Sequence, residues 1–214
     1  MSDAITASDD AMRKTMLALG SATLGESGAH RMASRIKAVW RGAAVAAPAF
    51  PVRCTPGDNL AVHVAVARAP AGHVLCVDVG DVPDLGYWGE VLTTGAEARG
   101  IAGLVIDGCV RDVDALEAHG FPVFSSGIAL PGATKRLPGS IGRVATVGDV
   151  IAELGDWVVA DVDGVVVIPS GSLDDVLASA RGRAETEQGF FAALRGGATT
   201  VELLSLDDSL IDGP

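Results

Sequence analysis

The chain contains little of what several common enzyme classes require. Only 4% of its 214 residues are aromatic, its three cysteines form no C-x-x-C pair, and its only lysines are Lys14, Lys37 and Lys135. With so few aromatic residues, Ala, Val, Leu and Ile must build the core. A lysine that forms a Schiff base needs a desolvating pocket, whereas Lys135 lies in a loop rich in Gly and Pro. Metal-dependent chemistry is therefore favoured over chemistry that proceeds through an imine.

Several catalytic and nucleotide-binding motifs are also absent. The four histidines do not follow the H-E-x-x-H spacing of a zinc protease, and the G-x-S-x-G elbow of a serine hydrolase does not occur. Neither a G-x-x-x-x-G-K-[ST] phosphate loop nor a G-x-G-x-x-G turn after a strand is present. The sequence thus gives no support to these classes of hydrolase, NTPase or dinucleotide-binding enzyme.

The charge of the chain restricts its partners. The net charge of −11 repels phosphate backbones, which disfavours generic nucleic-acid binding. No apolar run is long enough to span a bilayer. The acidic N-terminus, M-S-D-A-I-T-A-S-D-D, lacks the apolar segment of an export signal, and an odd number of cysteines fits a reducing compartment. We therefore expect a cytoplasmic protein that binds neither nucleic acid nor a membrane.

Alternating strand and helix patterns predict an α/β fold with parallel strand pairing. We expect one domain over residues 1–214, with an N-terminal helical arm (1–32), an α/β core (35–169), a C-terminal helix (172–195) and an acidic, fraying tail (202–214). Ser172 and Asp175 fit a capping box for the C-terminal helix, and Pro48, Pro51 and Pro56 indicate a bend or a sheet edge. The predicted helices are 8–19, 58–69, 89–99 and 113–119; the predicted strands are 36–47 (one or two), 73–79, 102–106, 122–125 and a hairpin over 156–169, with a long loop over 127–142.

Residues 86–112 form the most informative segment, G-Y-W-G-E-V-L-T-T-G-A-E-A-R-G-I-A-G-L-V-I-D-G-C-V-R-D. Gly86 and Gly89 allow a tight turn into a helix, and the amides of Gly89, Glu90, Val91 and Leu92 are then free donors at its N-terminus. Such a terminus binds carboxylates or phosphates. The alternative is an ordinary strand-to-helix turn without a ligand.

Arg111 and Asp112 follow the strand at 102–106 and a turn at Asp107-Gly108. Arginine matches a carboxylate bidentately, and aspartate is a hard oxygen ligand suited to Mg²⁺ or Mn²⁺. Ligands of open α/β sheets gather at the carboxyl ends of strands, where this pair falls. The alternative is that Asp112 only caps the helix beginning at Val113 and that Arg111 is a solvated charge.

Glu187 lies on the apolar face of the predicted C-terminal helix. A carboxylate there is costly unless it is paired or functional. The alternative is that the helix loosens near Gly189 and that Glu187 reaches water. The apolar face comprises Leu173, Val176, Leu177, Ala180, Ala184, Phe191 and Leu194.

These residues together resemble the family of RraA-like proteins and 4-hydroxy-4-methyl-2-oxoglutarate (or 4-carboxy-4-hydroxy-2-oxoadipate) aldolases. The family motif is a glycine, three residues, an acid, twenty residues, then an arginine and an acid, and it is met by Gly86, Glu90, Arg111 and Asp112. Softer matches occur at residues 56–63, 69–78 and 160–169, so the resemblance covers roughly residues 35–193. The chain departs from the family in having Glu90 where aspartate is common and in its loop at 131–138.

The resemblance implies a swivelling β/β/α sandwich of the phosphohistidine-domain type, with helices flanking a mixed sheet. It also implies a homotrimer or a hexamer whose active site lies between subunits. Arg111 would grip the carboxylate of a small 2-oxo acid, Asp112 would hold Mg²⁺ or Mn²⁺, and the amides of residues 89–92 would bind the pyruvyl group. Glu90 would hold a water molecule, and Glu187 of a neighbouring subunit would orient it.

The implied function is that of a class II pyruvate aldolase that cleaves 4-hydroxy-2-oxo acids, with oxaloacetate decarboxylation as a further activity. The metal would act as a Lewis acid on the 2-oxo-carboxylate, and Arg111 would stabilise the enolate. The alternative is a regulatory protein that binds and inhibits a ribonuclease, as some members of the family do, because one fold can serve unrelated functions.

Overall fold

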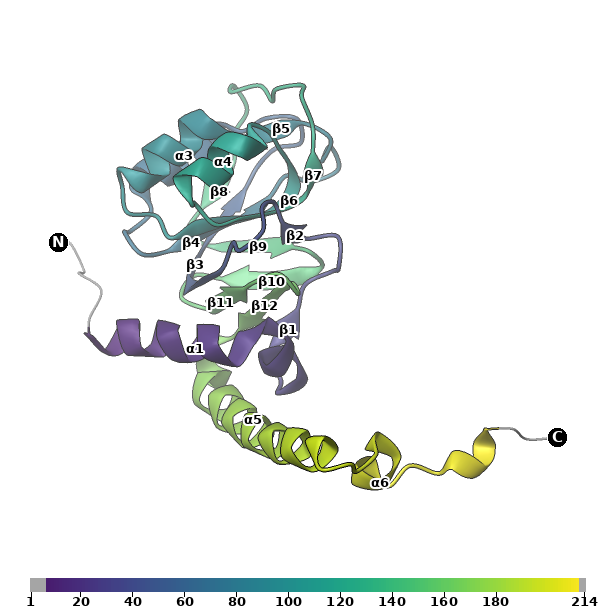
Figure 1. Ribbon diagram of the computed structural model, residues 1–214. Coiled ribbons are helices and arrows are strands. Elements are labelled where there is room, and N and C mark those ends of the chain that lie inside the picture. The colour runs from purple at the N-terminus through teal and green to yellow at the C-terminus, as the bar shows by residue number, and fades with distance from the viewer. Residues whose placement is uncertain (1–6, 212–214) are drawn as a thin grey trace.

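The computed structural model describes residues 7–211 and builds them into stacked layers of helices and strands (Figure 1). The helices are α1 (Ala7–Glu26), α2 (Leu60–Arg68), α3 (Glu90–Glu97), α4 (Val113–His119), α5 (Leu173–Arg195) and α6 (Thr200–Leu204), with 3-10 turns η1 (Ser170–Ser172) and η2 (Asp208–Leu210). The strands are β1 (His30–Arg31), β2 (Lys37–Ala38), β3 (Val45–Arg53), β4 (Val74–Asp78), β5 (Gly86–Trp88), β6 (Gly103–Val110), β7 (Val123–Ile128), β8 (Ser140–Ile141), β9 (Val144–Val147), β10 (Val150–Glu153), β11 (Trp157–Ala160) and β12 (Val165–Ile168).

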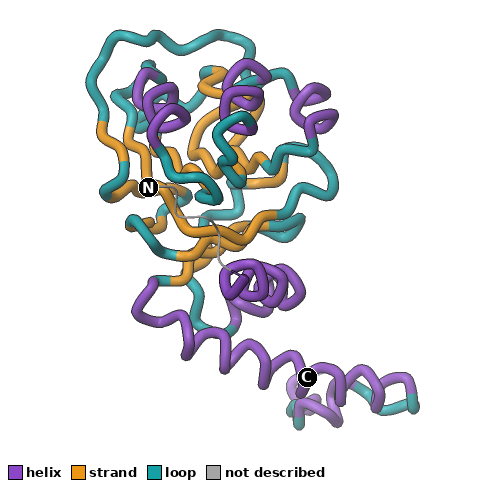
Figure 2. Tube along the Cα trace, turned by 90° about the vertical axis from the view of Figure 1, so that its left-hand side faces the viewer, coloured by secondary structure: helices purple, strands orange, loops and turns teal. Residues whose placement is uncertain are grey.

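The sheet is mixed and confirms the predicted fold class. Its strands run in the order β1-β12-β11-β3-β4-β6-β7-β2. The pairs β3–β4, β4–β6 and β6–β7 are parallel, and α2 and α4 lie in crossover connections between them. The remaining pairs on this path are antiparallel, including the predicted hairpin β11–β12. In Figure 2 the strands lie between helices on both sides.

Side chains that alternate along the parallel strands divide the core into layers. Leu75 and Val77 of β4 pack with the apolar faces of α2, α3 and α4. Val74 and Cys76 of the same strand point the other way and pack with β9–β12. A third cluster joins the outer face of β11 and β12 to α1 and the first half of α5. This period of two is what a sheet buried on both faces requires.

Two of the three prolines lie inside a strand rather than at an edge. β3 pairs with β11 up to Pro48 and with β4 from Ala49 onwards, so the strand changes partners at the first proline. Pro51 lies opposite Cys76 in the parallel pair, and its carbonyl accepts from the amide of Gly142. Of the two predicted alternatives, a bend or a sheet edge, the change of partners at Pro48 favours the bend. A strand that changes partners in this way can tolerate the missing donors.

The turn predicted at Asp107-Gly108 is wrong. β6 continues to Val110, and these two residues form a bulge where the register with β7 shifts between Ile106 and Cys109. Asp107 accepts hydrogen bonds from Arg35 and from the amide of Gly148. Because of the bulge, β6 ends four residues later than predicted, and Arg111 directly follows the strand.

The C-terminal segment departs from the prediction in two ways. Ser172 precedes α5 but makes no capping hydrogen bond, because η1 leads directly into the helix and its backbone is not extended. A capping box occurs instead at Thr199 and Glu202, which begin α6 within the tail that we expected to fray. The hairpin β9–β10 and the short β5 were not predicted. Residues 212–214 of the tail and 1–6 of the N-terminal arm lie outside the described residues.

A buried carboxylate fastens the long loop to the start of α2. Asp58 is 1% exposed and accepts from the hydroxyl of Thr134 (2.7 Å), from the amide of Leu60 (2.8 Å) and from the amides of Arg136 and Leu137. Burial acts to raise the pKa of Asp58, but these hydrogen bonds outweigh it and lower the pKa to about 2. The loop that carries Lys135 is thereby held against α2.

We predict that Asp58→Ala lowers the free energy of unfolding by about 3 kcal/mol, since it leaves three amides and one hydroxyl group without their acceptor. Because the folded pKa lies below the ordinary value of 3.8, the stabilisation is present above about pH 4 and is lost as the pH falls towards about 2. Urea unfolding at pH 7 and at pH 2.5 measures both effects. Asp81→Ala, at an exposed position, is the control; equal stability of the two variants at pH 7 would contradict the role of Asp58.

Candidate functional site

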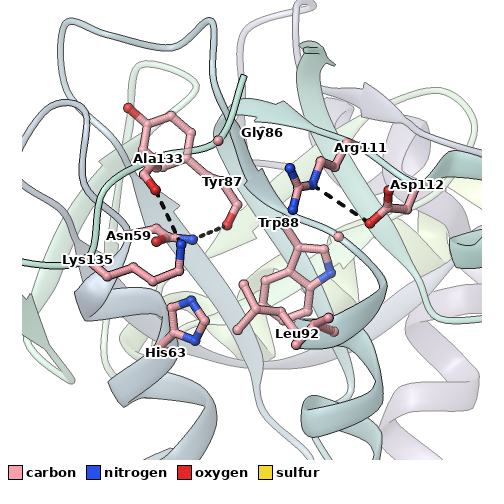
Figure 3. A pocket seen from close by; sticks show the side chains of 13 residues that line it. Asn59, His63, Gly86, Tyr87, Trp88, Leu92, Arg111, Asp112, Ala133 and Lys135 are labelled. Atoms are coloured by element: carbon pink, nitrogen blue, oxygen red, sulfur yellow. Dashed lines mark hydrogen bonds and ion pairs between the residues drawn. The ribbon is translucent and has the colours of Figure 1, made fainter. Parts of the chain in front are cut away.

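A pocket of about 180 Å³ opens at the carboxyl ends of β5 and β6 (Figure 3). Its walls come from α2, from β5 and the start of α3, from the residues after β6, and from the long loop. The parallel sheet explains the place, because strand ends and helix starts converge at one edge of such a sheet. The lining residues are Asn59, His63, Gly86, Tyr87, Trp88, Gly89, Val91, Leu92, Arg111, Asp112, Gly132, Ala133 and Lys135.

Gly86 of the motif and the neighbouring Gly89 both allow a close approach of the backbone to Arg111 and Asp112. A Cβ at position 89 would lie 2.4 Å from Oδ2 of Asp112 and 3.2 Å from Cγ of Arg111. A Cβ at position 86 would lie 2.8 Å from the carbonyl oxygen of Ala129 and 3.1 Å from Cδ of Arg111. The glycines therefore leave the space that the Arg111–Asp112 pair occupies, and the predicted turn into a helix is present.

Asp112 lies at the start of α4 but does not cap it with its side chain. Its Oδ2 instead accepts a hydrogen bond of 3.0 Å from the amide of Glu90, the first residue of α3. The backbone of Asp112 is left-handed, with φ of 60°, a conformation that costs energy for any residue with a side chain. The alternative in which Asp112 only caps α4 is thus wrong, and its carboxylate sits at the anion-binding end of α3.

Arg111 lies beside this carboxylate without a close pairing. Its Nε is 3.9 Å from Oδ2 of Asp112, and both side chains are nearly half exposed. The guanidinium therefore keeps donors available for a ligand in the pocket. Figure 3 shows the two side chains on the same side of the pocket, with the indole of Trp88 beneath Arg111.

The turn between β5 and α3 is rigid. The indole N–H of Trp88 donates to the hydroxyl of Thr93 (2.7 Å), and the ring stacks on Phe121 at a centroid distance of 5.9 Å. Leu92 is buried, whereas Val91 is 82% exposed at the pocket rim. The amides at the start of α3 are therefore fixed in direction, as an anion site requires.

Glu90 does not line the pocket, and its amide, predicted to be a free donor, is occupied by the carboxylate of Asp112. Its carboxylate points to His119 of α4, with Oε1 3.8 Å from Nε2. His119 also contacts Glu97, with 2.8 Å between Nδ1 and Oε2. The role predicted for the Glu90 carboxylate would require it to turn towards the pocket.

Glu187 is not brought to this pocket within one chain. It lies on α5, at the opposite end of the molecule from α3 (Figure 1), and pairs with Arg183 at 2.9 Å. α5 continues to Arg195 without loosening at Gly189. Its apolar face is buried only at Val176, Leu177 and Ala180. The prediction that Glu187 serves the site of a neighbouring subunit stays a prediction.

The pocket residues that the sequence did not predict include Asn59, His63 and Lys135. Within residues 7–211, Oδ1 of Asn59 and Nε2 of His63 are buried side-chain atoms without a hydrogen-bond partner, and Lys135 donates only to the carbonyl of Ala133, at 3.3 Å. Burial and the charge of Lys135 lower the pKa of His63, while Asp58 opposes them. Asn59 and His63 belong to the segment P-G-D-N-L-A-V-H, which resembles the corresponding segment of the family. This resemblance could have indicated the two residues, but it suggested no role for them.

The residues fit a hard divalent cation bound through few protein ligands. Asp112 offers a half-exposed carboxylate whose remaining lone pairs face the pocket. Nowhere in residues 10–211 do three or more His, Cys, Asp or Glu side chains gather as a ligand set. Mg²⁺ and Mn²⁺ are commonly held by one or two carboxylates with water and ligand oxygens completing the shell.

Among the helices of residues 7–211, none has the length and apolar character of a membrane-spanning segment.

Comparisons with known proteins agree with the resemblance seen in the motif. The model of the RraA-like family, described as Aldolase/RraA, matches residues 3–167. A protein of Halalkalibacterium halodurans named "Putative 4-hydroxy-4-methyl-2-oxoglutarate aldolase" is 36% identical over 154 residues, which are 72% of this chain and 73% of that protein.

Solved structures of similar fold include an uncharacterized protein from Pseudomonas syringae and the RNA-processing inhibitor RraA from Thermus thermophilis. The first has a TM-score of 0.79 at 26% identity and covers 91% of this chain and 96% of that one. The second has a TM-score of 0.60 at 26% identity and covers 65% of this chain and 85% of that one. The swivelling β/β/α architecture is thus confirmed.

We predict that Gly89→Ala displaces Asp112 from the amide of Glu90 and destabilises the fold by about 2 kcal/mol, because the new methyl group overlaps the carboxylate. Gly95→Ala is the matched control in the same helix: its Cβ would meet only Val66, at 3.5 Å, and should stabilise α3 by about 1 kcal/mol. Urea unfolding of the two variants measures the difference. An unchanged stability and an unmoved Asp112 in a crystal structure of Gly89→Ala would refute the prediction.

Proposed function

This chain belongs to the RraA-like family, and we propose that within it the chain is a divalent-metal-dependent aldolase. Its substrates would be 4-hydroxy-2-oxo acids of the 4-hydroxy-4-methyl-2-oxoglutarate type, cleaved to pyruvate and a second oxo acid. Decarboxylation of oxaloacetate would be a further activity, because it passes through the same enolate. The observation that carries the proposal is the Arg111–Asp112 pair, held at the N-terminus of α3 inside a pocket.

The residues of the pocket suggest how the 2-oxo-carboxylate would be held. Arg111 would bind the carboxylate with its free guanidinium donors. The amides at the start of α3 would bind the pyruvyl oxygens, except that of Glu90, which donates to Asp112. Asp112 would hold Mg²⁺ or Mn²⁺, which when bound supplies Lewis acidity next to the 2-oxo group. As the bond between C3 and C4 breaks, Arg111 would stabilise the negative charge that develops on the pyruvate oxygen.

The cleavage also needs removal of the proton from the 4-hydroxyl group. A water molecule oriented by a carboxylate can accept this proton, and Glu90 and Glu187 are the candidates to orient it. Glu90 is anchored by its amide beside Asp112. Glu187 would come from a neighbouring subunit.

The remaining pocket residues suit the distal part of a di-acid. Lys135 supplies a positive charge, and the unpartnered atoms of Asn59 and His63 are buried beside it. An orphaned buried polar atom is costly unless a ligand satisfies it. We infer that these three side chains contact the second carboxylate or the hydroxyl group of the substrate.

The C-terminal arm, residues 181–211, supports a homo-oligomer. Its part of α5 projects away from the sheet (Figure 1), and it leaves large apolar side chains exposed. Several large exposed apolar side chains on one projecting segment favour an interface. A trimer or a hexamer in which the arm packs on a neighbour would bring Glu187 to a second chain. The exposed apolar residues of the arm are Phe191, Val201, Leu204, Leu206, Leu210 and Ile211.

A second candidate function is regulation of a ribonuclease by direct binding. It is favoured by the similarity of fold to the RNA-processing inhibitor RraA. A regulator of this kind needs no turnover, so it would form no pyruvate with Mg²⁺ or Mn²⁺ and would bind its partner in the presence of EDTA.

We predict that the chain releases pyruvate from 4-hydroxy-2-oxo acids with Mg²⁺ or Mn²⁺, that EDTA abolishes the activity, and that Asp112→Asn lowers kcat at least a hundredfold. Arg111→Lys should raise KM and lower kcat, because lysine cannot bind a carboxylate bidentately. A coupled pyruvate assay over a panel of substrates and oxaloacetate is the measurement. Asp114→Asn, an exposed acid two residues from Asp112, is the control. Wild-type rates in Asp112→Asn, or no pyruvate from the wild-type chain, would exclude the aldolase.

We predict that Asp112→Asn and Glu187→Gln complement each other when the two chains are assembled together. Each variant alone lacks one half of every site, whereas random mixing in a ring restores roughly a quarter of the sites. Co-expression with two different tags, purification of the mixed oligomer and the pyruvate assay measure this. If the mixed oligomer is no more active than the better single variant, Glu187 does not act across the subunit boundary.

A further inference from the structure

The side chain of Asn59 is buried in the pocket wall in a fixed orientation. It is 4% exposed, and its Nδ2 donates a hydrogen bond of 2.8 Å to the carbonyl oxygen of Tyr87 in β5 (Figure 3). Turning the amide over would set Oδ1 against that carbonyl oxygen, where two acceptors would face each other. The other atom of the amide is therefore the acceptor Oδ1, and among the described side chains it has no hydrogen-bond partner.

Asn59 does not use this acceptor for the task that its place in the chain suggests. It is the N-cap of α2, where an asparagine side chain usually accepts from an amide of the first helical turn. No such bond is made here. Oδ1 of Asp58 accepts from the amide of Leu60 instead, at 2.8 Å. The acceptor of Asn59 is thus left for a group that enters the pocket, which Asn59 lines.

The chemistry of this atom restricts what can satisfy it. An amide oxygen accepts hydrogen bonds and donates none, so its partner must carry an O–H or an N–H. Ionised carboxylates and a 2-oxo group offer only acceptors and are excluded from this position. In a 4-hydroxy-2-oxo acid, the 4-hydroxyl group is the donor. A ligand that bears a hydroxyl group is therefore what the wall at Asn59 fits.

Lys135 supplies the opposite chemistry in the same pocket. Its ammonium group has three donors and no acceptor, and it donates to the carbonyl of Ala133 at 3.3 Å rather than to Asn59. The backbone of its loop is held by the bond between Asp58 and Thr134, so only the long side chain has to turn to meet an anion. A hydroxyl group and a carboxylate on one carbon atom would satisfy both residues at once.

We propose that Asn59 is a specificity-determining residue whose Oδ1 accepts a hydrogen bond from the 4-hydroxyl group of the substrate, while Lys135 binds the carboxylate on the same carbon. This rests on the proposed function and separates the roles of the distal pocket residues. Asn59 does not take the hydroxyl proton, because an amide is not a base at neutral pH. The hydroxyl group has to leave this bond to give up its proton, so the bond favours binding and not the chemical step.

The test compares 4-hydroxy-2-oxoglutarate with 2-oxoglutarate, which lacks only the hydroxyl group and therefore cannot be cleaved, on the metal-loaded protein. Asn59→Ala should raise KM for the first acid about tenfold, as expected for one hydrogen bond, without lowering kcat. The inhibition constant of the second acid should stay within about twofold. Lys135→Met is the matched control and should weaken the binding of both acids to a similar degree, because both carry the distal carboxylate.

The wild-type chain gives a comparison that does not depend on how well a variant folds. It should bind the 4-hydroxy acid about tenfold more tightly than 2-oxoglutarate. Equal affinities of the wild type for the two acids would overturn the proposal. So would equal losses for both acids in Asn59→Ala, which would show a merely structural role, or a loss that appears in kcat instead of KM.

Failure of the proposed function is distinguishable from failure of this assignment. If the wild-type chain forms no pyruvate, the proposed function fails, and the 4-hydroxy acid is then not consumed. Titration calorimetry gives the Kd of each acid under that condition. A lower Kd for the 4-hydroxy acid, lost in Asn59→Ala, would still support recognition of the hydroxyl group, and equal Kd values would overturn it.

Discussion

The geometry of the site depends on one hydrogen bond, from the amide of Glu90 to the carboxylate of Asp112. It joins the start of α3 to the end of β6, which are separated by 22 residues in the chain. The contact requires a strained left-handed backbone at Asp112 and a residue without a Cβ at position 89. Because Glu90 and Asp112, the two acids of the motif, make this contact, it accounts for the spacing between them in the sequence.

The sheet supplies the framework on which this contact is made. The bulge at Asp107-Gly108 lets β6 continue beyond the level at which β4 ends, so Arg111 and Asp112 reach the level of the short β5. A bulge also strengthens the local twist, and such features are common beside active sites. On the other side, Asp58 fastens the loop with Lys135 to α2. Two walls of the pocket are therefore the extended end of β6 and the loop that Asp58 holds in place. Both are fixed within the chain, which makes the pocket largely preformed.

The sequence predicted those parts of the structure that local patterns determine. The helix at 113–119 and the hairpin around Asp163-Gly164 occur where periodicity and turn residues indicated them. The bulge in β6 was misjudged, and the choice between a bend and an edge for the prolines in β3 stayed open, because these conformations depend on neighbouring strands. Asn59 and Lys135 were missed for a similar reason: they are brought together by long-range contacts such as that between Asp58 and Thr134, 76 residues apart.

The arm raises a different constraint, since among the described residues the second half of α5 has no fully buried side chain. A helix in water gains most of its stability from packing its apolar face, and the face with Phe191 lacks that packing. The same stretch carries the Arg183–Glu187 pair. If a neighbouring subunit covers the apolar face, one association event both stabilises the arm and delivers Glu187. Assembly and completion of the site would then be a single equilibrium, and a change that weakens the interface would remove activity without touching any residue of the pocket.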